Sequence, residues 1–138
     1  MVKLRVGVVG CGIGREHIRA LQTLPDWFEV AAVCDSVAGK AQAVADEFGV
    51  ESAVTSLDAL CGIDDLDIID ICTPSYLHHE QSLQGLAAGK HVICEKPVGA
   101  SLRQVDELAL AAAGAGRQLM PVYQYRFGHG AQKLKLLV

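Results

Sequence analysis

Three glycines that follow an apolar run form the first pattern in the sequence that suits ligand binding. Residues 4–9 lead directly into Gly10, Gly12 and Gly14. Gly10 permits a tight turn, and Gly12 lets a pyrophosphate approach the backbone because no Cβ is in the way. Free N–H groups at the start of the helix that follows would attract the phosphates. The usual spacing is G-x-G-x-x-G; the third glycine here comes one residue early, which predicts a shorter phosphate loop.

A carboxylate, Asp35, follows the second apolar run of the chain, residues 28–34. A carboxylate at this place can accept hydrogen bonds from an adenosine ribose and repel a 2′-phosphate. Ser36 and Val37 come next, not an arginine, so the pattern favours NAD over NADP; Lys40 lies nearby and could soften the discrimination. The residues alone leave open the alternative that Asp35 caps the next helix.

Two polar clusters follow other apolar runs of strand length. One contains Thr73 and Pro74, with His78 close behind, and the other is the Glu-Lys-Pro sequence at 95–97. Doubly wound sheets bind their ligands at the carboxyl ends of strands, and both clusters are expected there. Lys96, between an acid and a proline, is well placed to be held rigidly. The alternative for any single lysine is a solvated surface charge, and the strand-end position favours the functional interpretation.

Strand-length apolar runs alternate with stretches of helical periodicity. The expected strands are residues 4–9, 28–34, 66–72, 91–94 and 118–123, with a weaker one at 52–55. The expected helices follow the glycine turn, span 41–48 before Gly49, run from a Ser75 cap to Ala88, and run from a Ser101 cap to near Gly114. Near-continuous apolarity indicates strands covered on both faces. We therefore predict a single α/β domain with a doubly wound, mostly parallel sheet of the Rossmann type.

Composition excludes several classes of protein. The 138 residues suit one domain, and 51% hydrophobic with 20% charged residues exclude disorder. A net charge of −4 argues against nucleic acid as a partner. The first apolar run is too short to span a bilayer and no secretory leader opens the chain, so we expect no membrane partner. The five cysteines form no C-x-x-C pair, which predicts reduced, packed thiols in the cytoplasm and no metal site.

The ordered motifs of the whole chain resemble those of the Gfo/Idh/MocA family, the relatives of glucose-fructose oxidoreductase and inositol dehydrogenase. A T-P-x-x-x-H motif followed by a G-K-H-V-x-x-E-K-P motif is specific to that resemblance, whereas the glycine turn alone is not. The matching segments are the glycine turn with His17, Asp35, 70–74 with His78, 88–97, and 124–127.

The resemblance implies a role for each matching residue around a nicotinamide dinucleotide. The three glycines and the backbone around Ile13 would hold the pyrophosphate, and Asp35 would hold the adenosine ribose. Thr73 and Pro74 would line the adenine and ribose side, with His78 behind them. NAD is the expected cofactor, with NADP less favoured.

At the other end of the cofactor, Glu95 and Lys96 would face the nicotinamide. Lys96 corresponds to the recurrent active-site lysine of the family, and it would polarise or protonate the oxygen on the carbon that gains or loses hydride. The family's peptide before Pro97 is often cis. His17 matches a recurrent histidine, which we interpret as packing or helix support, not chemistry.

Members of the family are normally more than twice as long, with a second α+β domain that supplies an acid/base pair and most of the substrate pocket. We expect residues 1–123 to form the dinucleotide-binding domain, and 124–138 to begin the connection to a second domain that this sequence lacks. The apolar residues of that tail then predict an exposed docking face and self-association.

Two functions follow from these expectations. The first is the NAD-binding domain of a dehydrogenase that transfers hydride between the nicotinamide and a hydroxyl or carbonyl carbon of a sugar or polyol, inactive as an isolated chain. The alternative is a non-catalytic dinucleotide sensor. Lys96 at the nicotinamide end favours the enzyme, because a sensor has no need of it.

Overall fold

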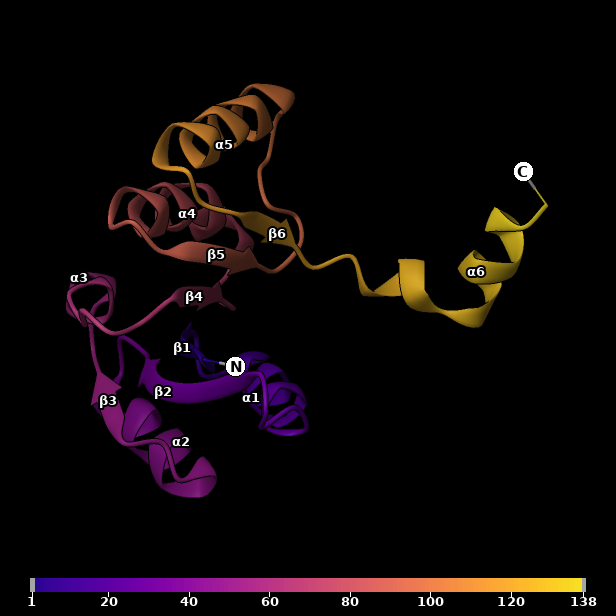
Figure 1. The fold of residues 1–138 in the computed structure, drawn as a ribbon. Coiled ribbons are helices and arrows are strands. Elements are labelled where there is room, and N and C mark those ends of the chain that lie inside the picture. Colours follow the sequence, from indigo (N-terminus) through magenta and orange to yellow (C-terminus); the bar gives the residue numbers. More distant parts are fainter. Residues whose placement is uncertain (1, 138) are drawn as a thin grey trace.

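A six-stranded, all-parallel sheet forms the centre of residues 2–137, which are those that this computed structural model describes (Figure 1). The strand order is β3-β2-β1-β4-β5-β6. The chain therefore runs outward from β1 to one edge, returns to the middle, and runs outward again from β4. This order confirms the predicted doubly wound fold and puts the reversal of direction between β1 and β4.

The elements alternate along the chain as the sequence predicts. In order they are β1 (Leu4–Val9), α1 (Gly14–Gln22), β2 (Phe28–Cys34), α2 (Ala38–Phe48), β3 (Ser52–Val54), α3 (Leu57–Cys61), β4 (Ile68–Ile71), the 3₁₀ helix η1 (Ser75–Leu77), α4 (His78–Ala87), β5 (His91–Cys94), α5 (Leu102–Ala115), β6 (Leu119–Pro121), the 3₁₀ helix η2 (Gln124–Phe127) and α6 (His129–Lys135).

Each face of the sheet has its own core. Ile18 of α1 and Val44 of α2 pack with Val6, Val8 and their neighbours on one face. On the other face the buried residues come from α3, α4 and α5 together with β2, β4 and β5. On the first face, α1 packs on β1 and β2, and α2 packs on β2 and β3. Among the described residues, no helix packs on this face over β5 and β6 (Figure 1).

Several expected boundaries are confirmed and others are wrong. Gly49 ends α2 in the left-handed conformation, with φ of 65°, and Ser101 caps α5 by accepting a hydrogen bond from the amide of Gln104. Ser75 does not cap a long helix; it begins the short η1, and α4 starts at His78. The third and fifth expected strands are shorter at both ends than predicted, because only their central residues pair with neighbouring strands.

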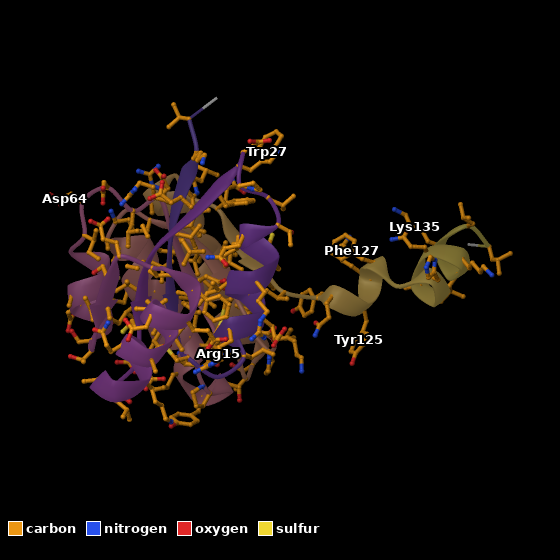
Figure 2. All side chains as sticks on the ribbon, turned by 90° about the horizontal axis from the view of Figure 1, so that it is seen from below. Arg15, Trp27, Asp64, Tyr125, Phe127 and Lys135 are labelled. Carbon is orange, nitrogen blue, oxygen red and sulfur yellow. The ribbon has the colours of Figure 1, made fainter. Side chains whose placement is uncertain are left out.

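The segment after β6 leaves the body of the domain. Figure 1 shows η2 and α6 extending away from the sheet, and Figure 2 shows Tyr125, Phe127 and Lys135 on this extension. Its apolar side chains are exposed; Tyr125 is 83%, Phe127 74% and Leu136 85% accessible. Within residues 2–137, no helix combines the length and the apolar character that a membrane crossing requires.

Candidate functional site

The glycine turn lies at the carboxyl end of β1, and its three glycines differ in what a side chain at each position would contact. Gly10 has φ of +97°, and a Cβ there would lie 2.5 Å from the carbonyl oxygen of Cys72, so only glycine fits. A Cβ on Gly14 would lie 3.0 Å from Val8 Cγ1, which reflects close packing of α1 on β1. A Cβ on Gly12 would meet nothing within 4 Å. Gly12 therefore leaves open space from which a ligand could approach the backbone.

Asp35 connects the end of β2 to this turn. Its Oδ2 accepts a hydrogen bond from the Cys11 amide at 3.1 Å, and its Oδ1 accepts one from the Val37 amide at 3.0 Å. Val37 is the N-cap residue before α2, so this bond closes a turn that leads into the helix and caps none of the amides in its first turn. Carboxylate oxygens have further lone pairs, so these two bonds leave acceptor capacity for a ligand hydroxyl.

A hollow of about 250 Å³ opens beside Asp35, and we call it the Asp35 hollow. Its walls come from the ends of β1 and β2, from the segments that follow β3 and β4, and from α3, η1 and α4. Asp35, Thr73 and Pro74, which are predicted to bind the adenosine half of a dinucleotide, line it together with Gly10, which is predicted to hold the pyrophosphate. The structure thus brings together four residues that are far apart in the sequence.

His78 lies behind this hollow and is 1% exposed. Its Nε2 lies 2.7 Å from the carbonyl oxygen of Thr73, and its Nδ1 lies 2.8 Å from the carbonyl oxygen of Pro97. The side chain therefore connects the loop after β4 to the loop after β5. His78 does not line the hollow, so its place is behind the binding residues, as the resemblance implies.

The Glu-Lys-Pro sequence directly follows β5. The peptide bond between Lys96 and Pro97 is cis, as expected from the resemblance. The Lys96 amide donates to Oε2 of Glu95 at 3.0 Å, and the Lys96 side chain is exposed at the carboxyl edge of the sheet. Lys96 therefore stands at the predicted edge of the sheet, with an ammonium that an incoming substrate could reach.

A second hollow, of about 370 Å³, lies on the other side of the glycine turn. We call it the His17 hollow. Its walls come from α1, β4, β5 and β6, with Ile13 at the glycine turn and Glu95 directly after β5, and they combine apolar side chains with those of His17 and Asp70. This hollow extends over the sheet face beside α1 and reaches the carboxyl edge at Ile13 and Glu95, which are the predicted binding residues in its lining. The glycine turn therefore lies between the two hollows, with Asp35 on one side and Glu95 on the other.

His17 has more than the packing role that the sequence suggests. Its Nδ1 lies 2.9 Å from Oδ2 of Asp70, and its Nε2 lies 3.2 Å from Oε1 of Glu95. The hydrogen bond with Asp70 raises the pKa of His17; burial opposes the rise, while the charge of Asp70 and the interactions with Glu95 add to it. Asp70 is itself 1% exposed. His17 therefore bridges two carboxylates, one buried and one at the edge of the site.

Sequence reasoning gave Asp70 no role, although it is the one carboxylate inside the apolar run of β4 and could have been found there. Sequence reasoning also gave no role to Lys90, which is buried just before β5. Its ammonium donates to the carbonyl oxygens of Ile63, Asp64 and Leu66 at 2.8–3.0 Å, which fixes the segment leading into β4.

The cysteines fulfil the expectation of packed thiols. Cys11, Cys34, Cys72 and Cys94 are buried, Cys61 is half-buried, and all five are free. Burial raises the pKa of Cys34 and of Cys94 to about 11, which keeps both thiols protonated and unreactive.

A doubly wound parallel sheet, a glycine turn at its point of reversal and a carboxylate at the end of β2 together define a Rossmann-type dinucleotide-binding domain. The chain belongs to the oxidoreductase family with an NAD-binding Rossmann fold that includes Gfo, Idh and MocA, whose family model matches residues 4–123.

Curated relatives match nearly all of this chain. It is 34% identical to D-glucoside 3-dehydrogenase of Escherichia coli over 96% of the chain and 38% of that protein. It is 30% identical to inositol 2-dehydrogenase of Salmonella typhimurium over 98% of the chain and 41% of that protein. The chain therefore spans about two fifths of the length of these relatives.

Solved structures show the same architecture. The WlbA dehydrogenase from Bordetella pertussis, solved with NADH and UDP-GlcNAcA, superposes with a TM-score of 0.91 at 32% identity, over 98% of this chain and 41% of that one. A 3-ketoreductase from Actinomadura kijaniata, solved with NADP, gives a TM-score of 0.91 at 30% identity, over 99% of this chain and 44% of that one.

Proposed function

We propose that this chain binds NAD(H) across the carboxyl edge of its sheet and forms the cofactor-binding part of a dehydrogenase acting on a sugar or polyol. The observation that carries the proposal is the pair of hollows on either side of the glycine turn. A dinucleotide is two nucleotides joined by a pyrophosphate, so it suits two hollows separated by a turn that gives its backbone to the phosphates.

The residues around the turn fit such a ligand. Gly12 leaves the approach to the backbone open, and α1 begins at Gly14 with its first N–H groups facing that end. In this proposal the adenosine half occupies the Asp35 hollow, between Asp35 and Thr73. The nicotinamide end lies beyond Ile13, toward Glu95 and Lys96.

We prefer NAD to NADP because Asp35 faces the hollow in which the adenosine ribose would lie. A carboxylate accepts hydrogen bonds from ribose hydroxyls, and its charge disfavours a 2′-phosphate at the same place. Both kinds of cofactor occur among the solved relatives, so the direct comparison of NADH with NADPH is an informative test.

Bound NAD(H) supplies or accepts the hydride. The proposed role of Lys96 is to donate a hydrogen bond or a proton to the substrate oxygen as charge develops on it. The named relatives act on a glucoside and on inositol, which supports a polyhydroxylated substrate. We propose that the isolated chain does not turn over, because its Lys96 is exposed and nothing in the described residues would hold a substrate against it.

We also propose that the chain self-associates and that it resides in the cytoplasm. The exposed apolar side chains of residues 123–137 support self-association through a docking face. The free, packed cysteines support a reducing compartment, the cytoplasm. Nucleic acid and membrane lipid are not among the partners we propose.

Titration of NADH, followed by its fluorescence, tests the proposal on the chain itself. We expect saturable binding that Gly12→Val abolishes, because a branched side chain would fill the space the pyrophosphate needs. Gly114→Val is the matched control, since a Cβ there also meets nothing within 4 Å but lies in α5. Circular dichroism verifies the fold of both variants. Equal binding by wild type and Gly12→Val would overturn the proposed position of the phosphates.

In a form of the protein that oxidises a sugar or polyol, Lys96→Ala separates binding from catalysis. We expect a severe loss of kcat with little change in the Kd for NADH. A near-normal kcat would remove Lys96 from the mechanism.

A further inference from the structure

A chain of polar contacts joins the helix that follows the glycine turn to the backbone of Lys96. It starts at the buried Asp70, passes through His17 to Oε1 of Glu95, and continues from Oε2 of Glu95 to the Lys96 amide. The contacts connect three elements: α1, β4 and the segment after β5.

The protonation of His17 decides how many of these contacts can exist together. Both ring nitrogens face carboxylate oxygens, at 2.9 Å and 3.2 Å. A neutral imidazole has one N–H and can donate to only one of them, whereas an imidazolium donates to both. The interactions with Asp70 and Glu95 also raise the pKa of His17.

Other titratable groups near His17 affect whether its ring carries the second proton. Glu16, on α1, lines the same hollow as His17. The Cys72 thiol lies 3.6 Å from Oδ1 of Asp70, and its pKa is raised by burial, so it acts as a neutral donor to that carboxylate. The hollow residues of β6, Met120 and Val122, carry no charge. Glu16 forms an ion pair with Arg19 of the same helix, so the charges that act on His17 are those of Asp70 and Glu95.

The two carboxylates differ in how firmly they are held. Asp70 is buried in β4 and also accepts from the Cys72 thiol, so the neutral imidazole would keep its single N–H toward Asp70. Glu95 is 12% exposed in its side chain and lies at the rim, where water can replace a lost donor. Deprotonation of His17 would therefore release Glu95 first.

We propose that His17 is a positioning residue: as an imidazolium it fixes Glu95, and through Glu95 the backbone of Lys96, at the nicotinamide end of the site. This inference rests on the proposed function, since it assumes that NAD(H) lies across the glycine turn. It adds a pH dependence. As pH rises and His17 loses its proton, the site binds the nicotinamide half of NAD(H) less tightly, whereas its affinity for the adenosine half stays the same.

The test compares NADH with ADP-ribose, which lacks the nicotinamide, across a range from about pH 6 to about pH 9. For the wild type we expect the Kd for NADH to increase by about three- to tenfold at the high end, while the Kd for ADP-ribose changes little. His17→Asn removes the titrating group, so NADH binding should be weak and flat with pH, with ADP-ribose binding retained as evidence of the fold. His79→Asn is the matched control. His79, on α4, also lies 3.1 Å from a carboxylate oxygen, that of Glu107, but it is not part of the His17 hollow.

A second measurement does not need a ligand. Nuclear magnetic resonance titration of the histidine rings should give His17 a higher midpoint in the wild type than in Glu95→Gln, with the midpoint of His79 unchanged. Equal midpoints would overturn the contact with Glu95.

The outcomes separate the two proposals. Binding of neither NADH nor ADP-ribose would overturn the proposed function and this inference with it. Binding of both, with the same pH dependence for NADH in the wild type and in His17→Asn, would overturn the role of His17 and leave the proposed function standing.

Discussion

The amide of Cys11 donates a hydrogen bond to Oδ2 of Asp35 across 3.1 Å. This contact ties the glycine turn after β1 to the residue that follows β2. Asp35 thus helps to order the glycine turn, and we propose that its remaining acceptor capacity serves the ribose of a bound dinucleotide.

The first prediction concerns the charge of Asp35. Asp35→Asn keeps one acceptor oxygen but loses the negative charge, so we expect NADH to bind about tenfold more weakly and the preference over NADPH to narrow. Calorimetric titration of both cofactors measures this. Asp46→Asn, on the exposed side of α2, is the control. An unchanged preference would reduce Asp35 to a structural residue of the turn.

The second prediction separates two glycines of one turn. Gly10→Ala forces a Cβ to within 2.5 Å of the Cys72 carbonyl oxygen at a positive φ, so we expect the free energy of unfolding to fall by about 1–3 kcal/mol. Gly12→Ala meets open space and should change stability by only about 0.5 kcal/mol. Urea denaturation of both variants checks the difference, and equal losses would show that the turn relaxes around either side chain.

The third prediction concerns Lys90, which is 8% exposed. Lys90→Met fills a similar volume but leaves the carbonyl groups of Ile63, Asp64 and Leu66 without their donor. We expect the free energy of unfolding to fall by about 2–3 kcal/mol. Lys3→Met, at an exposed position before β1, should be close to neutral. A Lys90 variant as stable as the control would mean that water replaces the ammonium without cost.

The sequence predicted the doubly wound class of the sheet and the edge that carries the site better than it predicted the ends of the elements. Continuous apolar runs mark parallel strands buried on both faces, and polar residues just after them mark the carboxyl edge. Short elements escaped this reasoning; α3 has five residues, too few for helical periodicity to show. Ser75 suits a cap by type, but the chain makes a 3₁₀ turn there before α4 begins.

The contacts of His17 could not be predicted from sequence, because its partners lie 53 and 78 residues away and depend on how α1 packs over the sheet. The burial of Lys90 could not be predicted either, because its carbonyl partners are also distant in the sequence. A lysine next to the glycine that follows a helix is usually solvated, and only the fold shows three carbonyl oxygens around the ammonium of Lys90.

The fourth prediction concerns the extended tail. Leu136 and Leu137 are 85% and 83% exposed, so we expect the chain to self-associate with increasing concentration. Replacing both with serine should reduce the association measured by sedimentation velocity. Leu110→Ser, at a 75% exposed position on α5, is the control and should leave it unchanged. Equal association by both variants would place the contact elsewhere.

The central claim is that one dinucleotide spans both hollows and crosses the glycine turn. Amide chemical shifts recorded while NAD⁺ is added test it most directly, because each residue reports separately. We predict that the largest changes fall on Cys11, Gly12 and Ile13, with further changes at Asp35 and Thr73 on one side and at Glu95 on the other. Saturating NAD⁺ that leaves the glycine turn unshifted, or that shifts only residues of α5 and β6, would contradict the claim.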